Sequence, residues 1–150
     1  MAGERILAIN GPNLNLLGRR EPGVYGTETL DGIAARLREL AVGELACTVE
    51  TRQSNQEGVI IDWIHEAWDG FEGVLINPGA FTHYSYAIRD AISAVEVPVV
   101  EVHISNPHAR EEFRHVSTIS GVSAGVVTGF GAYSYELGLR GLIHTLRSGA

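Results

Sequence analysis

The sequence contains no lysine. All 11 of the basic residues in this chain of 150 residues are arginines. This absence excludes mechanisms that need a primary amine on a side chain, namely Schiff-base catalysis, covalent attachment of pyridoxal phosphate and the lysine of a phosphate-binding P-loop. Any permanent positive charge that acts on a substrate is therefore carried by a guanidinium group.

Cysteine and long apolar runs are also scarce. Cys47 is the only cysteine, so one chain can build neither an internal disulfide nor a thiolate zinc cluster, and the sequence suits a reducing compartment. No apolar run approaches the ~18 residues that a membrane span needs, and the N-terminus lacks the apolar segment of a signal peptide. We expect a soluble, unprocessed, cytoplasmic protein.

Basic residues are outnumbered by 18 acidic ones, which gives a formal net charge of -7. This balance argues against nucleic acid or an anionic membrane as the main partner, but it leaves a small anionic substrate open. A length of 150 residues with 45% hydrophobic content predicts a single domain, residues 1–150, with one continuous core.

Short apolar runs alternate with segments of helical period along the chain. The runs that predict strands are 5–9, 45–52, 74–76, 99–103 and 125–128. The segments that predict helices are 30–41, 54–68, 82–95 and 135–146, with a short helical turn at 107–113. This alternation predicts an α/β fold, a three-layer flavodoxin-like sandwich with a five-stranded parallel sheet in the order 2-1-3-4-5.

Two of the helices carry more detailed predictions. Ser54 and Glu57 have the spacing of a capping box that would open the second helix. In the third helix, 82–95, the helical period predicts that Tyr84 faces inward together with Ile88 and Ala91.

Polar side chains follow several of the predicted strands at their carboxyl ends, where parallel sheets bind ligands. The loop after the first strand is aperiodic and carries Asn13, Arg20 and Tyr25. Asn77 and His83 follow the third strand, and His103 and Ser105 follow the fourth. We expect these side chains to meet at one edge of the sheet.

Several chemistries compete for this edge. No glycine-rich dinucleotide motif follows the first strand, and Asn77 stands where a receiver domain would need aspartate. His83, Glu101, His103 and His108 are suitable metal ligands, although their spacing matches no known ligand pattern, so a metal-dependent hydrolase stays open. A non-catalytic flavodoxin-like binding module is the third class.

Acid–base chemistry by tyrosine and histidine is the remaining class. Tyrosine has an ordinary pKa of ~10, so a tyrosine base needs positive charge nearby, and Arg20 on the same loop can supply it. Tyr25 is equally well explained as a loop anchor that packs on the surface. His103 lies two residues after Glu101, so the two side chains share a sheet face, either as an acid with its orienting carboxylate or as a satisfied core histidine.

Five motifs, several of them long, match in order and resemble those of the type II 3-dehydroquinate dehydratases. They are 10–26 (NGPNLNLLGRREPGVYG), 53–58 (QSNQEG), 77–83 (NPGAFTH), 88–90 (IRD) and 101–114 (EVHISNPHAREEFR). The similarity spans nearly the whole chain. It implies a cofactor-free hydro-lyase, with no metal, that converts 3-dehydroquinate to 3-dehydroshikimate by anti elimination of water, in aromatic amino acid biosynthesis (the shikimate pathway) or in quinate catabolism.

The resemblance also implies roles for individual residues. Tyr25 would be the general base, with Arg20 and Arg110 lowering its pKa, and His103, oriented by Glu101, would be the general acid. The residues implied to place the base, a water or the substrate are Asn13, Asn77, His83, Ile104, Ser105 and Arg114.

The family forms dodecamers built of trimers, in which the position of Asp90 completes the neighbouring subunit's site. From its sequence context alone, Asp90 would be a solvated helix residue. Two positions depart from the family pattern: Tyr84 replaces an expected threonine beside His83, and Gly121 follows Ser120 where proline is common.

Overall fold

Five parallel strands form the centre of the protein in a computed structural model that describes residues 3–149. The strands are β1 (Arg5–Asn10), β2 (Thr48–Gln53), β3 (Gly73–Asn77), β4 (Val99–His103) and β5 (Gly125–Thr128). Their order in the sheet is β2-β1-β3-β4-β5, which confirms the predicted topology.

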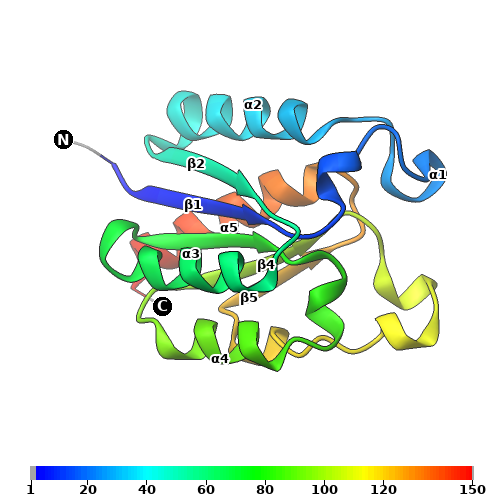
Figure 1. The fold of residues 1–150 in the computed structure, drawn as a ribbon. Coiled ribbons are helices and arrows are strands. Elements are labelled where there is room, and N and C mark those ends of the chain that lie inside the picture. Colours follow the sequence, from blue (N-terminus) through cyan, green and yellow to red (C-terminus); the bar gives the residue numbers. More distant parts are fainter. Residues whose placement is uncertain (1–2, 150) are drawn as a thin grey trace.

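Helices cover both faces of this sheet (Figure 1). On one face lie α2 (Leu30–Leu40) and α5 (Tyr133–Ser148), and on the other lie α3 (Glu57–Gly70) and α4 (Tyr86–Ala94). The short α1 (Pro22–Tyr25) stands apart, beyond the carboxyl ends of the strands at the right of Figure 1. The fold is therefore the predicted three-layer, flavodoxin-like sandwich.

Two apolar clusters, one on each sheet face, hold the layers together, so the prediction of one continuous core is wrong because the sheet separates the two clusters. In β1, Ile6 and Ala8 belong to the cluster under α2 and α5, whereas Leu7 and Ile9 belong to the cluster under α3 and α4. Successive residues of a strand point to opposite faces, so a strand buried on both sides is apolar throughout. No helix within residues 3–149 is long and apolar enough to cross a membrane.

The predicted capping box at the start of α3 is wrong. The N-cap is Gln56, and the Ser54 hydroxyl accepts a hydrogen bond from the Gln56 amide instead of capping the helix. The Glu57 carboxylate is engaged elsewhere, because it accepts a hydrogen bond of 2.5 Å from the Ser85 hydroxyl. Ser85 is itself the N-cap of α4, so a tertiary contact between two helix starts replaces the local motif.

The predicted helix 82–95 is two elements. A 3-10 turn, η3 (Gly79–His83), precedes α4, and the chain breaks the helical path at Tyr84 (φ -149). The prediction that Tyr84 faces inward is wrong, since it is 59% exposed and packs edge-on against Phe81. The second strand also begins later than predicted, because a π-helical turn, η2 (Ala41–Leu45), precedes it.

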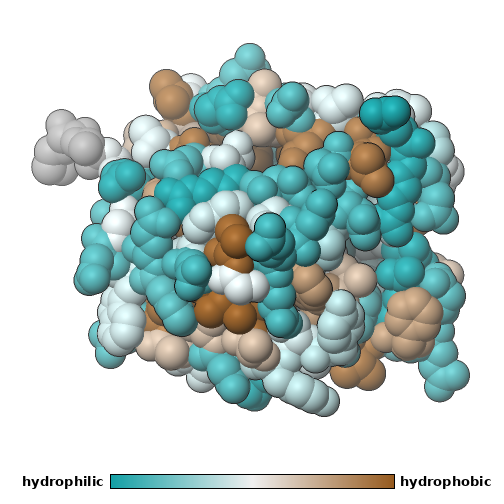
Figure 2. Space-filling view, viewed as in Figure 1, coloured by the Kyte–Doolittle hydropathy of each residue, from teal (hydrophilic) through white to brown (hydrophobic). Residues whose placement is uncertain are grey.

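The surface is mostly hydrophilic on the face shown in Figure 2, with separate hydrophobic areas. One area lies over the segment 107–116 at the lower right, where Phe113 and Val116 are 61% and 65% exposed. Tyr84 and Tyr86, at the start of α4, are also largely exposed. These apolar side chains lie near the carboxyl edge of the sheet.

Gly138 fixes how closely α5 approaches the sheet, and it supplies a stability prediction. A Cβ atom there would lie 2.5 Å from Val102 Cγ1 and 2.8 Å from Leu75 Cδ1. We expect Gly138→Ala to lower the free energy of unfolding by about 1–3 kcal/mol through overpacking, measured by urea denaturation. Gly141→Ala is the matched control on the same helix, because nothing lies within 4 Å of its added Cβ. It should be neutral or stabilising, and equal behaviour of the two variants would contradict this packing.

Candidate active site

The loop after β1 is anchored in the core at its start and is exposed at its far end. Leu14 and Leu17 are buried in the core, and Asn13 adopts a left-handed conformation with its amide donating to Asn55 Oδ1 (3.0 Å). Gly18 and Gly26 take positive φ values of 89° and 81°, which glycine accepts without strain. The loop thus turns back on itself and brings Tyr25 over the strand ends.

Two guanidinium groups lie against the ring of Tyr25. The Cζ of Arg20 is 4.7 Å from the ring centroid, and that of Arg110 is 5.1 Å from it. Arg110 comes from the segment after β4 and also donates to the Ser105 hydroxyl (3.2 Å). The positive charges stabilise electron density on the ring and its oxygen.

Glu101 and His103 project from the same face of β4, as their spacing predicts. Nε2 of His103 lies 2.5 Å from Oε2 of Glu101, whose side chain is fully buried. Burial raises the pKa of Glu101, but hydrogen bonding and charge from His103, with help from nearby hydroxyls, outweigh it and leave the pKa below its ordinary value. An ionised Glu101 can only accept, so Nε2 of His103 carries a proton and Nδ1 is the nitrogen left for a ligand.

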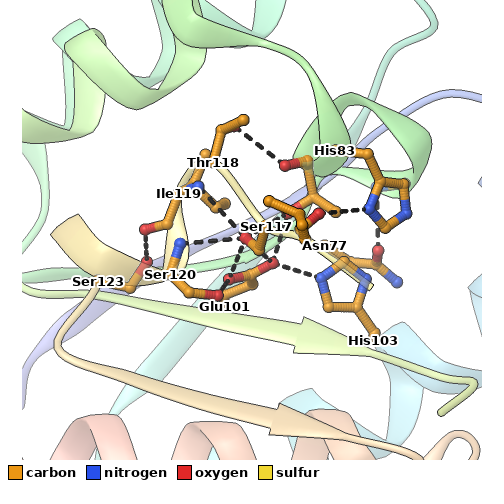
Figure 3. Close-up of polar contacts among 12 residues, drawn as sticks. Asn77, His83, Glu101, His103, Ser117, Thr118, Ile119, Ser120 and Ser123 are labelled. Atoms are coloured by element: carbon orange, nitrogen blue, oxygen red, sulfur yellow. Dashed lines mark hydrogen bonds and ion pairs between the residues drawn. The ribbon is translucent and has the colours of Figure 1, made fainter. Parts of the chain in front are cut away.

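Three hydroxyl groups surround Glu101 in addition to His103, as Figure 3 shows for the two serines. Thr82, Ser117 and Ser120 all donate to its carboxylate oxygens. None of these hydroxyls stood out in the sequence. The signal that could have found them is the glutamate itself, since a carboxylate inside an apolar strand must find donors from other segments.

His83 is held by the backbone of a distant segment. Its Nδ1 donates to the carbonyl oxygen of Val116 (2.9 Å), and its ring packs edge-on against Phe113. Burial, the largest effect, lowers the pKa of His83 below its ordinary value, and charge from His103 and Arg114 acts in the same direction. His83 is therefore a neutral imidazole at pH 7 whose Nε2 can accept a hydrogen bond.

Asn77 is hydrogen-bonded to Tyr135, a residue of α5 that is not among the expected site residues. The Tyr135 side chain lies on the buried face of α5, and its hydroxyl accepts a hydrogen bond from Asn77 Nδ2 (2.9 Å) and donates to Asn10 Oδ1 (2.7 Å). Asn77 Oδ1 in turn accepts from the Gly79 amide (3.1 Å). Burial raises the pKa of Tyr135, so its hydroxyl stays protonated and bridges the ends of β1 and β3.

One small pocket, of about 70 Å³, collects these groups. Its walls include ten of the expected site residues: Asn13, Arg20, Tyr25, Asn77, His83, His103, Ile104, Ser105, Arg110 and Arg114. A wider hollow of about 500 Å³ adjoins it and shares Tyr25, Ile104, Ser105 and Arg110. Glu101 lies behind His103, outside this pocket.

Two other features from the sequence analysis, Asp90 and the candidate metal ligands, can also be located in the structure. Asp90 lies on the exposed face of α4 and lines neither of these two cavities. In the part of the chain that the structure describes, no three histidine, cysteine, aspartate or glutamate side chains are arranged to hold a metal ion. The grouping of His83, Glu101, His103 and His108 as one ligand set therefore has no support.

Comparison with known proteins decides the family. A model of the family described as Dehydroquinase class II matches residues 4–143. The chain belongs to this family. Class II dehydroquinases are carbon–oxygen lyases, so the chain is an enzyme of the hydro-lyase class.

Relatives of known name are similar over nearly their whole length. The chain is 58% identical over 144 residues to a 3-dehydroquinate dehydratase of an Exiguobacterium species, covering 96% of this chain and 97% of the relative. It is 56% identical over 140 residues to one of Halalkalibacterium halodurans, covering 93% and 96%.

Solved structures agree with these relatives. The type II dehydroquinase from Butyrivibrio crossotus superposes with a TM-score of 0.91 at 46% identity, covering 95% of this chain and 99% of that one. The type II dehydroquinase from Propionibacterium acnes gives 0.90 at 50% identity, covering 94% and 97%. The family resemblance stated from the motifs is therefore confirmed for this dehydroquinase.

The Tyr135 bridge gives a prediction of its own. Tyr135→Phe removes the hydroxyl that joins Asn10 to Asn77 and leaves both buried amides short of a partner. We expect a loss of about 1–3 kcal/mol in the free energy of unfolding. Tyr133→Phe, at a side chain that is 51% exposed, is the control and should change it by less than about 0.5 kcal/mol. Equal denaturation midpoints for both variants would show that the bridge does not stabilise the fold.

Proposed function

We propose that this dehydroquinase is a cofactor-free 3-dehydroquinate dehydratase in which Tyr25 is the general base and His103 the general acid. The observation that carries the proposal is a single pocket in which a tyrosine lies against two arginines and a histidine lies against an ionised carboxylate. Family membership supports the overall reaction, and these contacts support the division of roles.

In the first step, the Tyr25 phenolate removes a proton from the carbon beside the ketone of 3-dehydroquinate. The electron pair of that carbon–hydrogen bond moves toward the ketone oxygen, which becomes an enolate. Arg20 and Arg110 compensate the negative charge of the phenolate before transfer. Asn13 and Asn77 hold a water and the substrate, so that donors face the oxygen where charge develops.

In the second step, the enolate collapses and expels the hydroxyl on the neighbouring carbon. His103 gives its Nδ1 proton to this hydroxyl, which leaves as water, and 3-dehydroshikimate is formed. The Glu101 carboxylate compensates the charge of the imidazolium through Nε2. Tyr25 and His103 act on opposite faces of the substrate's ring, which gives an anti elimination.

The remaining wall residues hold the substrate. Ser105 and the backbone of Ile104 bind the substrate carboxylate, a role supported by the Arg110 guanidinium beside the Ser105 hydroxyl. Arg114 and the neutral His83 bind the other ring hydroxyls. A locally positive pocket explains how a protein with a net charge of -7 binds an anion.

Removing one oxygen atom tests the base. We expect Tyr25→Phe to lower kcat by about 10²–10⁴-fold, the usual contribution of a general base. Binding should remain, because the ring still packs against both arginines. Turnover is followed by the near-ultraviolet absorbance of the conjugated enone, and the wild-type assay is repeated with a chelator. Binding is measured by calorimetry with 3-dehydroquinate.

Controls separate this proposal from others. Tyr133→Phe should turn over normally, since Tyr133 lines neither the pocket nor the hollow. Normal turnover by Tyr25→Phe would show that the base is another group. Loss of wild-type activity on chelation would favour a metal-dependent reaction, and no enone signal from folded wild-type protein would overturn the dehydratase assignment.

The proposed assembly is a dodecamer built of trimers, located in the cytoplasm, in which Asp90 completes the site of a neighbouring subunit. Asp90 is exposed on α4, and the largely exposed Tyr84, Tyr86, Phe113 and Val116 offer apolar contact area nearby. The elimination would serve aromatic amino acid biosynthesis (the shikimate pathway) or quinate catabolism.

Mixed oligomers test the role of Asp90. Asp90→Ala and Tyr25→Phe should each be nearly inactive alone. Co-expressed with different tags, they should recover about one quarter of wild-type activity, the share of random neighbour pairs that combine an intact Tyr25 with an intact Asp90. Native mass spectrometry confirms the mixing and gives the subunit number. Mixed oligomers with no recovered activity would contradict a shared site.

A further inference from the structure

We infer that Ser117, with Ser120 and Thr82, positions the acid of this reaction by fixing the carboxylate of Glu101, and through it the ring of His103. These hydroxyls touch no substrate atom in the proposed function, on which this inference rests, so they are positioning residues. The segment 116–120 that carries both serines is called the strap below.

The strap is tied firmly to the rest of the fold. The backbone amide of Thr118 donates to the Thr82 carbonyl oxygen (2.7 Å), and its hydroxyl donates to the Ser85 carbonyl oxygen (3.3 Å). Ile119 is completely buried in the core cluster under α3 and α4. The strap therefore cannot shift without disturbing that core.

Ser117 is the centre of the contacts in Figure 3. Its hydroxyl donates to both oxygens of Glu101, at 3.1 Å and 3.0 Å, and accepts from the backbone amides of Ile119 (3.2 Å) and Ser120 (3.1 Å). The backbone thus orients the serine, and the serine orients the carboxylate.

The hydroxyls of Ser120 and Thr82 bind one carboxylate oxygen each, and together with Ser117 they form what is called the cage of Glu101 below. Ser120 donates to Oε1 and Thr82 donates to Oε2, both at 2.5 Å. Four side chains, these three and His103, donate to one buried carboxylate, which leaves it little freedom to rotate. Its Oε2 is held toward Nε2 of His103.

This cage also decides where the proton of the Glu101–His103 pair resides. With three hydroxyl donors, Glu101 remains a carboxylate and does not take the proton of Nε2. The imidazolium then keeps its Nε2 proton toward Glu101 and presents its Nδ1 proton to the departing hydroxyl, and after the transfer it is left as the neutral tautomer with Nε2 protonated. Loss of one donor weakens both the orientation and the tautomer preference.

The same strap also fixes the ring orientation of His83, the second histidine of the pocket. The Val116 carbonyl oxygen accepts the Nδ1 proton of His83. Both imidazoles are thereby held against one element that lies beyond β4 in the sequence and outside the substrate pocket. This shared dependence distinguishes the strap from an ordinary connecting loop.

Kinetics of paired variants test the inference. We expect Ser117→Ala to lower kcat about 10-fold and KM to change less than about 2-fold, because a charged hydrogen bond is lost while the pocket wall remains. Ser117→Thr should restore kcat. Ser123→Ala is the matched control, since that hydroxyl donates to the Ile119 carbonyl oxygen (2.8 Å) and not to Glu101; it should leave kcat unchanged.

A second variant covers the case in which Ser117→Ala fails to fold. Thr82→Val keeps the shape of the side chain and removes only the hydroxyl, so it should also lower kcat about 10-fold. In a Glu101→Gln background, neither substitution should reduce kcat further, because the hydroxyls act through the carboxylate.

Nitrogen-15 NMR of the imidazoles gives a readout that does not depend on turnover. Wild-type His103 should show a protonated Nε2 in its neutral form, and Ser117→Ala and Thr82→Val should show mixed tautomers. An unchanged His103 signal, or equal kcat for Ser117→Ala and Ser123→Ala, would overturn the inference. Inactive wild-type protein with the expected tautomer would instead overturn the proposed function and leave the positioning intact.

Discussion

The burial of one negative charge organises the carboxyl edge of the sheet in this dehydroquinase. A carboxylate removed from water is strongly destabilising unless donors replace its hydration. Glu101 is completely buried in the middle of β4 and receives its donors from η3, from β4 itself and from the segment beyond it. Those segments must converge at this point, and their convergence places His83 and His103 in the wall of the proposed substrate pocket.

On the opposite face of the sheet, a network of uncharged side chains likewise joins separate segments of the chain. Asn10 and Asn77 are paired at the ends of β1 and β3, and the buried Tyr135 hydroxyl joins their side chains. Among the described residues, every buried side-chain nitrogen or oxygen has a hydrogen-bond partner. The polar groups at the strand ends are therefore hydrogen-bonded on both faces of the sheet, and the loop that carries Tyr25 lies over these strand ends. Well-ordered strand ends beneath an exposed loop suit the proposed site, which must admit a substrate and then hold it in place.

The fold was largely predictable from local patterns, and the errors occurred at the starts of helices and strands, where a tertiary contact or a short turn replaced the expected element. Alternating apolar runs and helical periods predicted the sheet and its layers, because burial on both faces leaves a strong periodic pattern. The capping box failed because Glu57 accepts from Ser85, in another helix. Tyr84 was placed inward by its helical period, but the helix starts only at Tyr86.

By itself, the sequence determined which kinds of polar side chain lie at the carboxyl edge of the sheet, and it excluded mechanisms that need a lysine. Its motifs also identified the family. Which strand a polar residue follows depends on local order, so Tyr25, Asn77 and His103 could be assigned to one edge. Only the tertiary structure decided which groups touch: the arginines against Tyr25, the hydroxyls around Glu101, and Tyr135 between two asparagines. These contacts join residues far apart in the chain, and their geometry depends on how the layers pack, which no local pattern encodes.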